Sequence, residues 1–418
     1  MRTGWRAFVL LAVSGSYPLT ASGAEPVSEV RPQATAAPES ATDARKSLAA
    51  AAKWLWTQQG ADGGWHSGTY KVLESGQAMT PLVLEALSRV PGDIFAPTPE
   101  QRRRALDFIR KHVNAQGVIG LDDPELPEYP NYATALALKC LTRWGDTSDA
   151  ASIAQMHDYL AAEQFCEARG FKPDHMAYGG WGFGGPLPLG GSPGHMDIAH
   201  TRHVLEGLRL STPLPSREGP GEGRPSHPNN AHFQRSELFL KLLQRHPSET
   251  RPQPSDSGAA RPADWRAPFD GGFYFSPIVL AANKGREATH QGQPYYRSYA
   301  TATCEGVLAL LAAGVNRDDE RVQAAAKWLR EHPRLDYPEG VPLNQPAPWR
   351  ESIAFYHYSV RARAYTALQW PGQWRQEMAK LLVARQEPDG SFKNKVSHLM
   401  KEDDPLLATA LAVAVLCE

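Results

Sequence analysis

The chain has 418 residues, in which 44 Lys and Arg balance 45 Asp and Glu, and only four cysteines. The balanced charge leaves no basic surface for nucleic acid, so we predict no nucleic-acid partner. Four cysteines do not make a disulfide scaffold in a chain of this length, and buried free thiols are expected. The longest apolar run, Leu406 to Leu416, is about half of the roughly 20 residues that span a bilayer, so no transmembrane segment is predicted.

The N-terminus has the features of a secretory signal. Arg2 and Arg6 precede a short apolar stretch, and Ser22-Gly23-Ala24 supplies the small residues of a cleavage site. We therefore predict a signal peptide over 1–24 and export to the periplasm or the medium. Residues 25–42 are rich in Ala, Pro, Ser and Glu and are predicted to be a disordered linker. Residues 43–418 then form one repeat domain.

The first expected repeat element is a helix with a Thr followed by apolar residues four and seven places later. These spacings put all three residues on one helical face. The positions between them are mostly small, which is typical of a helix packed on every side. The copies begin at Thr80, Thr134, Thr201, Thr303 and Thr409, with a sixth at Arg361 in the Thr place.

Each of these inner helices follows a more amphipathic segment with a charged, solvated face. A hairpin of one outer and one inner helix cannot bury its apolar face alone, so six in series are expected to close into a ring. We predict an all-α fold, an α/α toroid of six helical hairpins, with loop insertions within about 211–263. The predicted outer segments are 48–59, 101–113, 153–165, 233–244, 321–331 and 374–386.

A turn containing Gly and an aromatic residue recurs between outer and inner helices. Gly ends the outer helix and permits a tight turn, the ring covers the hairpin end, and a Gln amide can satisfy open backbone groups. The second and fifth hairpins keep only remnants, at Gln116-Gly117 and Glu339-Gly340. The full turns lie at 58–65, 178–181, 270–273 and 386–392.

Together these turns and helices resemble the repeats of squalene and hopene cyclases and of protein prenyltransferase β subunits. The sequence is most similar to bacterial exported proteins with prenyltransferase and squalene-oxidase repeats. That likeness rests on the stretches 178–183, 297–299 and 385–392. The resemblance implies a terpene cyclase/prenyltransferase-like toroid around a cavity for an elongated apolar ligand of isoprenoid type.

The repeat register places polar side chains together where the inner helices begin. Asp197, Tyr299 and His357 each lie four residues before the Thr position, and His200 and Tyr356 lie nearby in the same register. Helix N-termini at this end would favour an anionic group. We predict Asp197, His200 and His357 as catalytic candidates. The predicted ligand-binding residues are Tyr132, Tyr299, Phe355, Tyr356 and Tyr365.

The resemblance also implies two reactions, each of which depends on a motif that can be compared with this sequence. Class II terpene cyclases carry an Asp-x-Asp-Asp-Thr motif whose middle Asp protonates the substrate, but here Ala199 replaces that Asp and His200 replaces the last one. Prenyltransferases bind zinc through an Asp-x-Cys pair and a later His. His357 matches that His, whereas Arg297-Ser298-Tyr299 stands where the pair is expected.

No cofactor is predicted, and zinc is the weaker alternative. A zinc site would be assembled from His357 and Cys304, with His200 and Asp197 as further candidates of suitable type. The segment from His195 to His203 is another metal-patch candidate, weighed against polar residues with backbone or water partners.

Three functions from different classes remain open. The first is a terpene cyclase/prenyltransferase-like protein that binds an isoprenoid-type ligand without the cyclase acid. The second is a non-enzymatic exported interaction scaffold, for a protein partner that the sequence does not identify. The third is a polysaccharide-processing toroid, which would need paired carboxylates across an open groove.

Overall fold

The structure is a computed structural model that describes residues 40–187, 191–211, 231–251, 254 and 265–418. The predicted signal peptide, most of the predicted linker and much of the 211–263 insertion lie outside these residues. Within the described ranges, none of the helices has the length and apolar character needed to cross a membrane.

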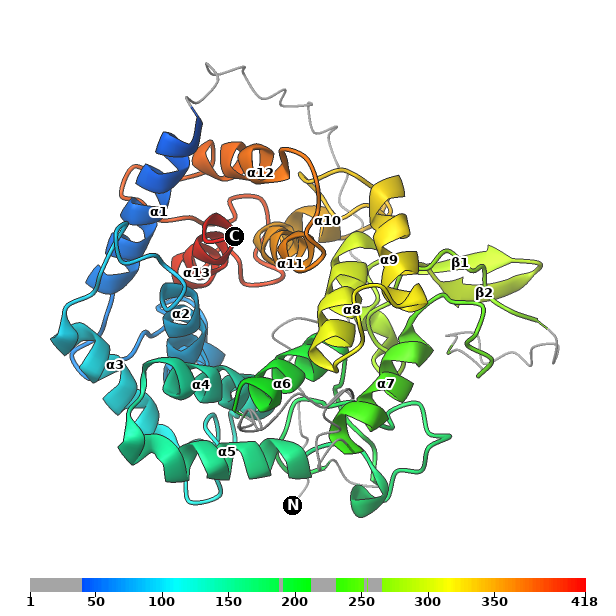
Figure 1. The fold of residues 1–418 in the computed structure, drawn as a ribbon, viewed down its shortest axis with the longest axis horizontal. Coiled ribbons are helices and arrows are strands. Elements are labelled where there is room, and N and C mark those ends of the chain that lie inside the picture. Colours follow the sequence, from blue (N-terminus) through cyan, green and yellow to red (C-terminus); the bar gives the residue numbers. More distant parts are fainter. Residues whose placement is uncertain (1–39, 188–190, 212–230, 252–253, 255–264) are drawn as a thin grey trace, which may run out of the picture.

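Six inner helices form a closed ring, as the repeat pattern predicted (Figure 1). Each contacts the next in chain order, and the last contacts the first. All are largely buried, which explains their small and apolar composition. They are α2 (Met79–Leu87), α4 (Pro130–Trp144), α6 (Ile198–Ser211), α8 (Ala300–Ala312), α11 (Ala354–Ala367) and α13 (Pro405–Leu416).

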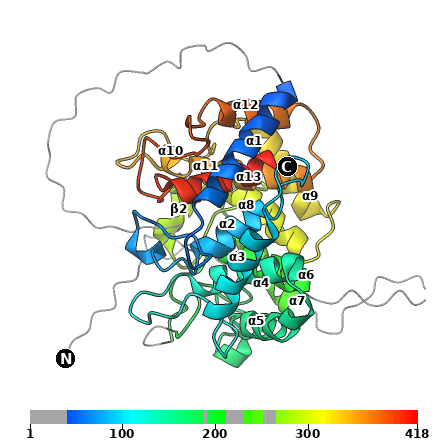
Figure 2. The ribbon, with the colours of Figure 1, turned by 90° about the vertical axis from the view of Figure 1, so that its left-hand side faces the viewer.

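Six outer helices surround this ring, and the α/α toroid is confirmed. Figure 2 shows α1 lying across α13, so the first outer helix packs against the last inner one and closes the outer layer. The fourth outer helix, predicted inside the insertion, is present as α7. The outer helices are α1 (Ser40–Thr57), α3 (Pro99–His112), α5 (Ala150–Ala162), α7 (Ala231–Leu243), α9 (Glu320–Glu331) and α12 (Trp374–Val383).

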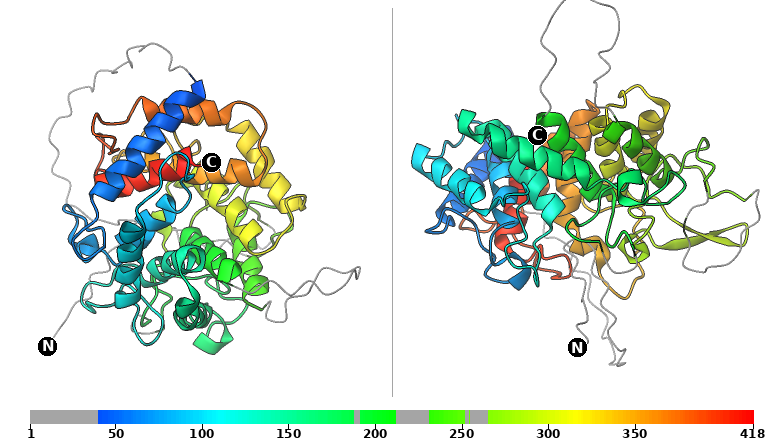
Figure 3. Two further views of the ribbon diagram at one scale, coloured as in Figure 1. Left: turned by 60° about the vertical axis from the view of Figure 1, so that its left-hand side comes forward. Right: turned by 90° about the horizontal axis from the view of Figure 1, so that it is seen from below.

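Shorter helices, turns and strands lie in the loops between the ring helices. Strands β1 (Glu287–His290) and β2 (Gln293–Tyr296) form an antiparallel hairpin that projects from the ring before α8 (Figure 3). The short helix α10 (Trp349–Ser352) precedes α11. Single 3₁₀ turns occur at 71–73, 147–149, 167–169 and 280–282.

The recurring Thr ties each turn to its inner helix. Its hydroxyl oxygen accepts the backbone N–H of the residue that follows the turn glycines, at 2.9 Å for Thr80 and Trp65 and at 3.1 Å for Thr201 and Trp181. The same bond occurs at Thr134, Thr303 and Thr409. The recurring Thr therefore has a structural role: it connects the turn to the inner helix by accepting from a backbone donor that burial would otherwise leave unpaired.

A Gln amide joins each full hairpin to the next outer helix. In the first hairpin, Gln59 donates to the carbonyl of Gly63 at 2.9 Å and to that of Gln101 in α3 at 3.0 Å. Gln386 of the last hairpin donates in the same way to Gly390 and to Ser47 of α1, which closes the ring. Gln164 and Gln244 repeat the arrangement, although neither is adjacent to its turn in the sequence.

The turn glycines allow this close approach. Gly179 has a φ of +85°, and a Cβ there would lie 1.9 Å from the carbonyl oxygen of Arg235 in α7. Gly117, in the degenerate second hairpin, has the same left-handed conformation and would meet Gln155 of α5 at 2.4 Å. These positions require glycine on both conformational and steric grounds.

Candidate functional site

The inner helices begin at one end of the ring, which we call the mouth, and carboxylates of the chain cap several of them. Asp197 Oδ1 accepts the His200 N–H at 2.9 Å at the start of α6. Glu402 accepts from Phe355 and Tyr356 at the start of α11, at 3.0 and 2.8 Å. Glu128 and Asp404 serve α2 and α13 in the same way. These N–H groups, expected to attract an anionic ligand, are thus already satisfied by internal acids.

A cavity lies at the mouth, beside the starts of five inner helices. Its volume is about 40 Å³, room for a few water molecules. Apolar side chains from α2 and α13 make up much of its wall, with His200, Tyr356 and Glu402 as polar members. The lining residues are Leu73, Ala78, Met79, Leu82, Tyr129, Tyr132, His200, Tyr356, Met400, Glu402, Leu407 and Leu411.

Glu402 is the acidic residue in the cavity lining, and its pKa is shifted. It is buried, and Asn394 Nδ2 donates to it at 3.1 Å in addition to the two α11 amides. Burial raises its pKa to about 7, in spite of these hydrogen bonds, which favour the ionised form. Glu402 therefore changes its charge near neutral pH at the wall of an apolar space.

Asp197 lies between two imidazoles next to the cavity. His195 Nε2 is 2.9 Å from Oδ2, and His200 Nδ1 is 3.0 Å from Oδ1. Burial alone would raise the pKa of Asp197, but the neighbouring His200 and His195 lower it below its ordinary value. Asp197 is consequently a carboxylate that accepts hydrogen bonds and is not a proton donor.

The two predicted tyrosines at the cavity have different roles. Tyr132 packs against His203 with ring centroids 4.2 Å apart, and against His200 at 6.0 Å. Tyr356 donates its hydroxyl to the buried Glu305. Burial raises the pKa of both phenols, so both remain protonated at neutral pH.

The other predicted residues lie away from the lining of this cavity. Tyr299 is buried at the start of α8, and His357 Nδ1 is 3.2 Å from Thr301 Oγ1. Phe355 packs edge-on against Phe392, and Tyr365 stacks on Trp370 at 4.4 Å, almost three turns further along α11. The mouth thus brings together Tyr132, Asp197, His200 and Tyr356, and leaves Tyr299, Phe355, His357 and Tyr365 in the surrounding packing.

The metal-ligand candidates separate into two groups. Within the described part of the chain, the only close group of three His, Cys, Asp or Glu residues is His195, Asp197 and His200. His357 and Cys304 are not in it. Burial raises the pKa of the Cys304 thiol to about 12, which opposes the thiolate that zinc requires. His203 points elsewhere, with Nε2 2.7 Å from Arg202.

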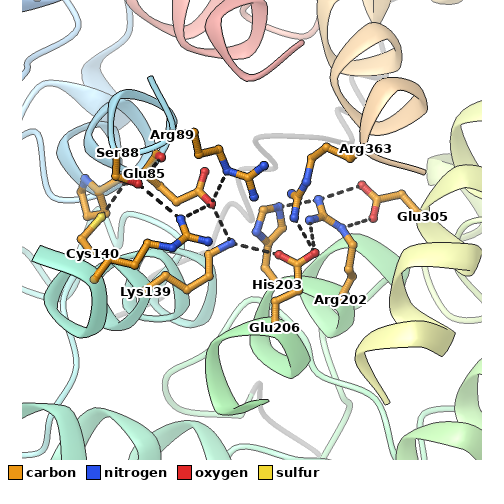
Figure 4. A network of polar contacts seen from close by, with 12 residues as sticks. Glu85, Ser88, Arg89, Lys139, Cys140, Arg202, His203, Glu206, Glu305 and Arg363 are labelled. Atoms are coloured by element: carbon orange, nitrogen blue, oxygen red, sulfur yellow. Dashed lines mark hydrogen bonds and ion pairs between the residues drawn. The ribbon is translucent and has the colours of Figure 1, made fainter. Parts of the chain in front are cut away.

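Deeper than the mouth cavity, a buried ion network crosses the interior of the ring between the inner helices (Figure 4). Lys139 of α4 lies 3.4 Å from Glu85 of α2 and 2.9 Å from Glu206 of α6. Glu206 also binds Arg202 at 3.0 Å and Arg363 of α11 at 2.8 Å. Arg202 continues to Glu305 of α8, so one chain of ion pairs joins five inner helices.

The charges of this network stabilise one another. Burial raises the pKa of Glu85, but Lys139 and Arg89 outweigh it and hold that pKa well below the ordinary value. Arg363 and Lys139 likewise outweigh burial at Glu206 and hold its pKa well below the ordinary value. This network was not predicted from the sequence, although Glu85, Lys139 and Glu206 all lie five residues after the recurring Thr. That shared register was the signal that could have revealed it.

The α/α toroid that these helices form is similar to solved structures of type II terpene cyclases. The type II terpene cyclase MstE from Scytonema, in complex with its substrate geranylgeranyl dihydroxybenzoate, matches with a TM-score of 0.52 and 13% identity over 90% of this chain and 98% of that one. MstE with its product merosterolic acid A matches with a TM-score of 0.53 and 14% identity over 90% and 96%. A protein from Actinoplanes matches with a TM-score of 0.50 and 15% identity over 89% and 98%. At these identities the likeness shows the fold alone.

No protein-family profile matches the sequence, and no curated protein shows significant similarity to it.

Proposed function

We propose that this protein binds an elongated apolar molecule of isoprenoid type at the mouth of the ring and does not carry out class II cyclisation. The observation that carries the proposal is the apolar wall of the mouth cavity, built by Met79, Leu82, Leu407 and Leu411. An apolar ligand gains free energy in proportion to the surface that it removes from water there. The few polar groups at the edge would orient a single polar end.

The fold supports the same choice of ligand. Two of the structures that share this fold hold a geranylgeranyl substrate and its cyclised product. The free volume of about 40 Å³ is far smaller than such a molecule. The side chains at the mouth must therefore move outwards on binding, and the flexible Met79 and Met400 are suited to such repacking.

The chemistry of Asp197 argues against cyclisation. A class II reaction needs a strong carboxylic acid, whereas two imidazoles keep Asp197 ionised. Ala199 and His200 occupy the places of the other acids of the motif. The buried charges of Arg202 and Glu305 further along the ring also differ from the dry aromatic chamber that a carbocation requires.

The experiment measures binding of geranylgeraniol to the purified full chain by isothermal titration calorimetry. The wild type should bind it, and Leu411→Phe, which fills the cavity, should weaken binding at least tenfold. Leu210→Phe is the matched control, because Leu210 is 39% exposed and lies outside the cavity lining. Absence of binding to the wild type, or equal binding by Leu411→Phe, would refute the proposal.

The interaction scaffold remains the second candidate, because the ion network occupies part of the ring interior with the chain's own side chains. A folded wild type that binds no geranylgeraniol and releases no lipid on solvent extraction would favour it.

A further inference from the structure

Three side chains of metal-binding type converge where the chain enters α6. His195 Nε2 and His200 Nδ1 face the two oxygens of Asp197 at 2.9 and 3.0 Å. The potential ligand atoms of all three residues lie within 4.8 Å of one another. Asp197 and His200 are buried, and the His195 side chain is 9% exposed. This is the close spacing that a single ion requires.

The backbone holds the three residues in place. The chain at Met196 pairs with Gly182, and the Phe183 N–H donates to the His195 carbonyl at 2.8 Å. Asp197 Oδ1 accepts the backbone N–H of His200 as the N-cap of α6, which fixes the plane of the carboxylate. Hydrogen bonds of this kind to a ligand carboxylate orient it in metal sites. The cluster is therefore preorganised by secondary structure and does not depend on flexible side chains.

The tautomers of both imidazoles can switch. A carboxylate only accepts hydrogen bonds, so His195 Nε2 and His200 Nδ1 both carry hydrogen in the metal-free protein. Within the described residues, the outer nitrogens, His195 Nδ1 and His200 Nε2, are buried without a hydrogen-bond partner. Movement of each proton to the outer nitrogen gives up the hydrogen bond to Asp197 and frees the inner lone pair for an ion, whose bonds to the same atoms replace that hydrogen bond.

We propose that His195 Nε2, the Asp197 carboxylate and His200 Nδ1 bind one divalent transition-metal ion, with Zn²⁺ as the best match. Two imidazoles and one carboxylate are ligands that Zn²⁺ accepts with three protein groups and an open position. With Zn–ligand lengths of about 2.0–2.2 Å, tetrahedral neighbours lie roughly 3.3 Å apart. His195 Nε2 lies 2.9 Å from Oδ2 and His200 Nδ1 lies 3.0 Å from Oδ1, so each imidazole already contacts one carboxylate oxygen and must shift outwards to admit the ion. Mg²⁺ and Ca²⁺ prefer oxygen-rich sites and fit less well.

This site is independent of the apolar ligand but adjoins its cavity. His200 belongs both to the cluster and to the cavity lining. An ion held there would place its open position near the mouth, where it could accept water or a polar group of a bound molecule.

The test titrates Zn²⁺ into the metal-stripped, tag-free full chain, measured by isothermal titration calorimetry and elemental analysis. One equivalent should bind to the wild type. Asp197→Asn keeps the helix cap, because Asn is also a good N-cap, but it removes the charged ligand. Asp197→Asn and His195→Gln should each weaken binding at least tenfold. His357→Gln, which changes a buried histidine outside the cluster, should bind as the wild type does.

A Co²⁺-substituted protein gives a second measurement. Visible absorption of a tetrahedral Co²⁺ centre should appear with the wild type and with His357→Gln and should be lost in His195→Gln. The proposal is overturned if the folded wild type, checked by circular dichroism, binds no stoichiometric Zn²⁺, or if Asp197→Asn and His195→Gln bind it unchanged. Neither result depends on geranylgeraniol binding, so failure of one proposal leaves the other standing.

Discussion

The mouth and the middle of the ring interior bury different chemistry on the inner helices. At the mouth, the first turns carry apolar side chains around a cavity, and acids such as Glu402 cap the free N–H groups. Deeper in the ring, Lys139, Glu206 and Arg202 cross between the inner helices as paired charges. The repeated residues therefore determine where the helices lie, while the side chains buried at the mouth and in the middle of the ring differ in character.

The largest expected effect comes from breaking the network. Glu305→Leu removes the buried partner of Arg202 and of the Tyr356 hydroxyl. Arg202 keeps Glu206 at 3.0 Å but loses its fully buried partner, so the free energy of unfolding should fall by about 3 kcal/mol, the lower end of the cost of breaking a buried ion pair. Urea denaturation of the purified proteins measures this change.

The matched control for this prediction is the double variant Glu305→Leu with Arg202→Met. Replacing both charges with apolar groups is often close to neutral, so it should recover most of the lost stability. A double variant as unstable as the single one would show that the network contributes through packing rather than charge pairing.

At the mouth, Glu402 should give a pH dependence of its own. Its folded-state pKa of about 7 lies above the ordinary 4.5. Between these values the folded state keeps a proton that the unfolded state has released, so the free energy of unfolding falls as pH rises through that window. Glu402→Gln does not titrate. The difference between wild type and variant should therefore change by roughly 3 kcal/mol from pH 4 to pH 8.

The network should respond to pH in the opposite direction. The pKa values of Glu85 and Glu206 are held low in the folded state, so their stabilisation is present above about pH 4.5 and is lost as pH falls below it. Wild type and Glu402→Gln should share this acid loss. Unfolding curves that run parallel over pH 4–8 would contradict the role given to Glu402.

A Leu to Phe substitution should distinguish the packing at the mouth from the packing in the middle of the ring. Leu138 of α4 is fully buried, and its Cδ2 would lie 3.5 Å from a Cβ placed on Gly207 of α6. Leu138→Phe should cost about 1–3 kcal/mol, because overpacking forces neighbours to move. Leu411→Phe has the mouth cavity to enter and should cost less. Thermal and urea unfolding of the two variants make the comparison, and equal losses would mean that the cavity cannot accept a larger ring.

The sequence was enough for the fold because its signals are local and repeated. Thr, turn Gly and small residues recur in register, and each has a backbone contact that explains it, as at Thr201 and Gly179. Of the residues predicted at the mouth, His200 and Tyr356 line its cavity, and Asp197 is hydrogen-bonded to His200. Pairings across hairpins were not readable, because Lys139 and Glu206 meet only when the ring closes. His195 was missed as a partner of Asp197 because it lies before the helix, outside the helical register.

The smallest expected effect lies at the rim of the network and separates its exposed part from its buried centre. Arg143 is 31% exposed at its side chain and lies 3.1 Å from Glu85. Arg143→Gln should lower the free energy of unfolding by about 0.2–1 kcal/mol, as exposed pairs usually do. In 1 M salt the Debye length falls to about 3 Å, so this small loss should disappear. The loss caused by Glu305→Leu should remain, because water and ions do not reach that pair. Denaturation of both variants at low and high salt measures the contrast, and equal salt sensitivity would mean that the centre of the ring is wetter than its burial indicates.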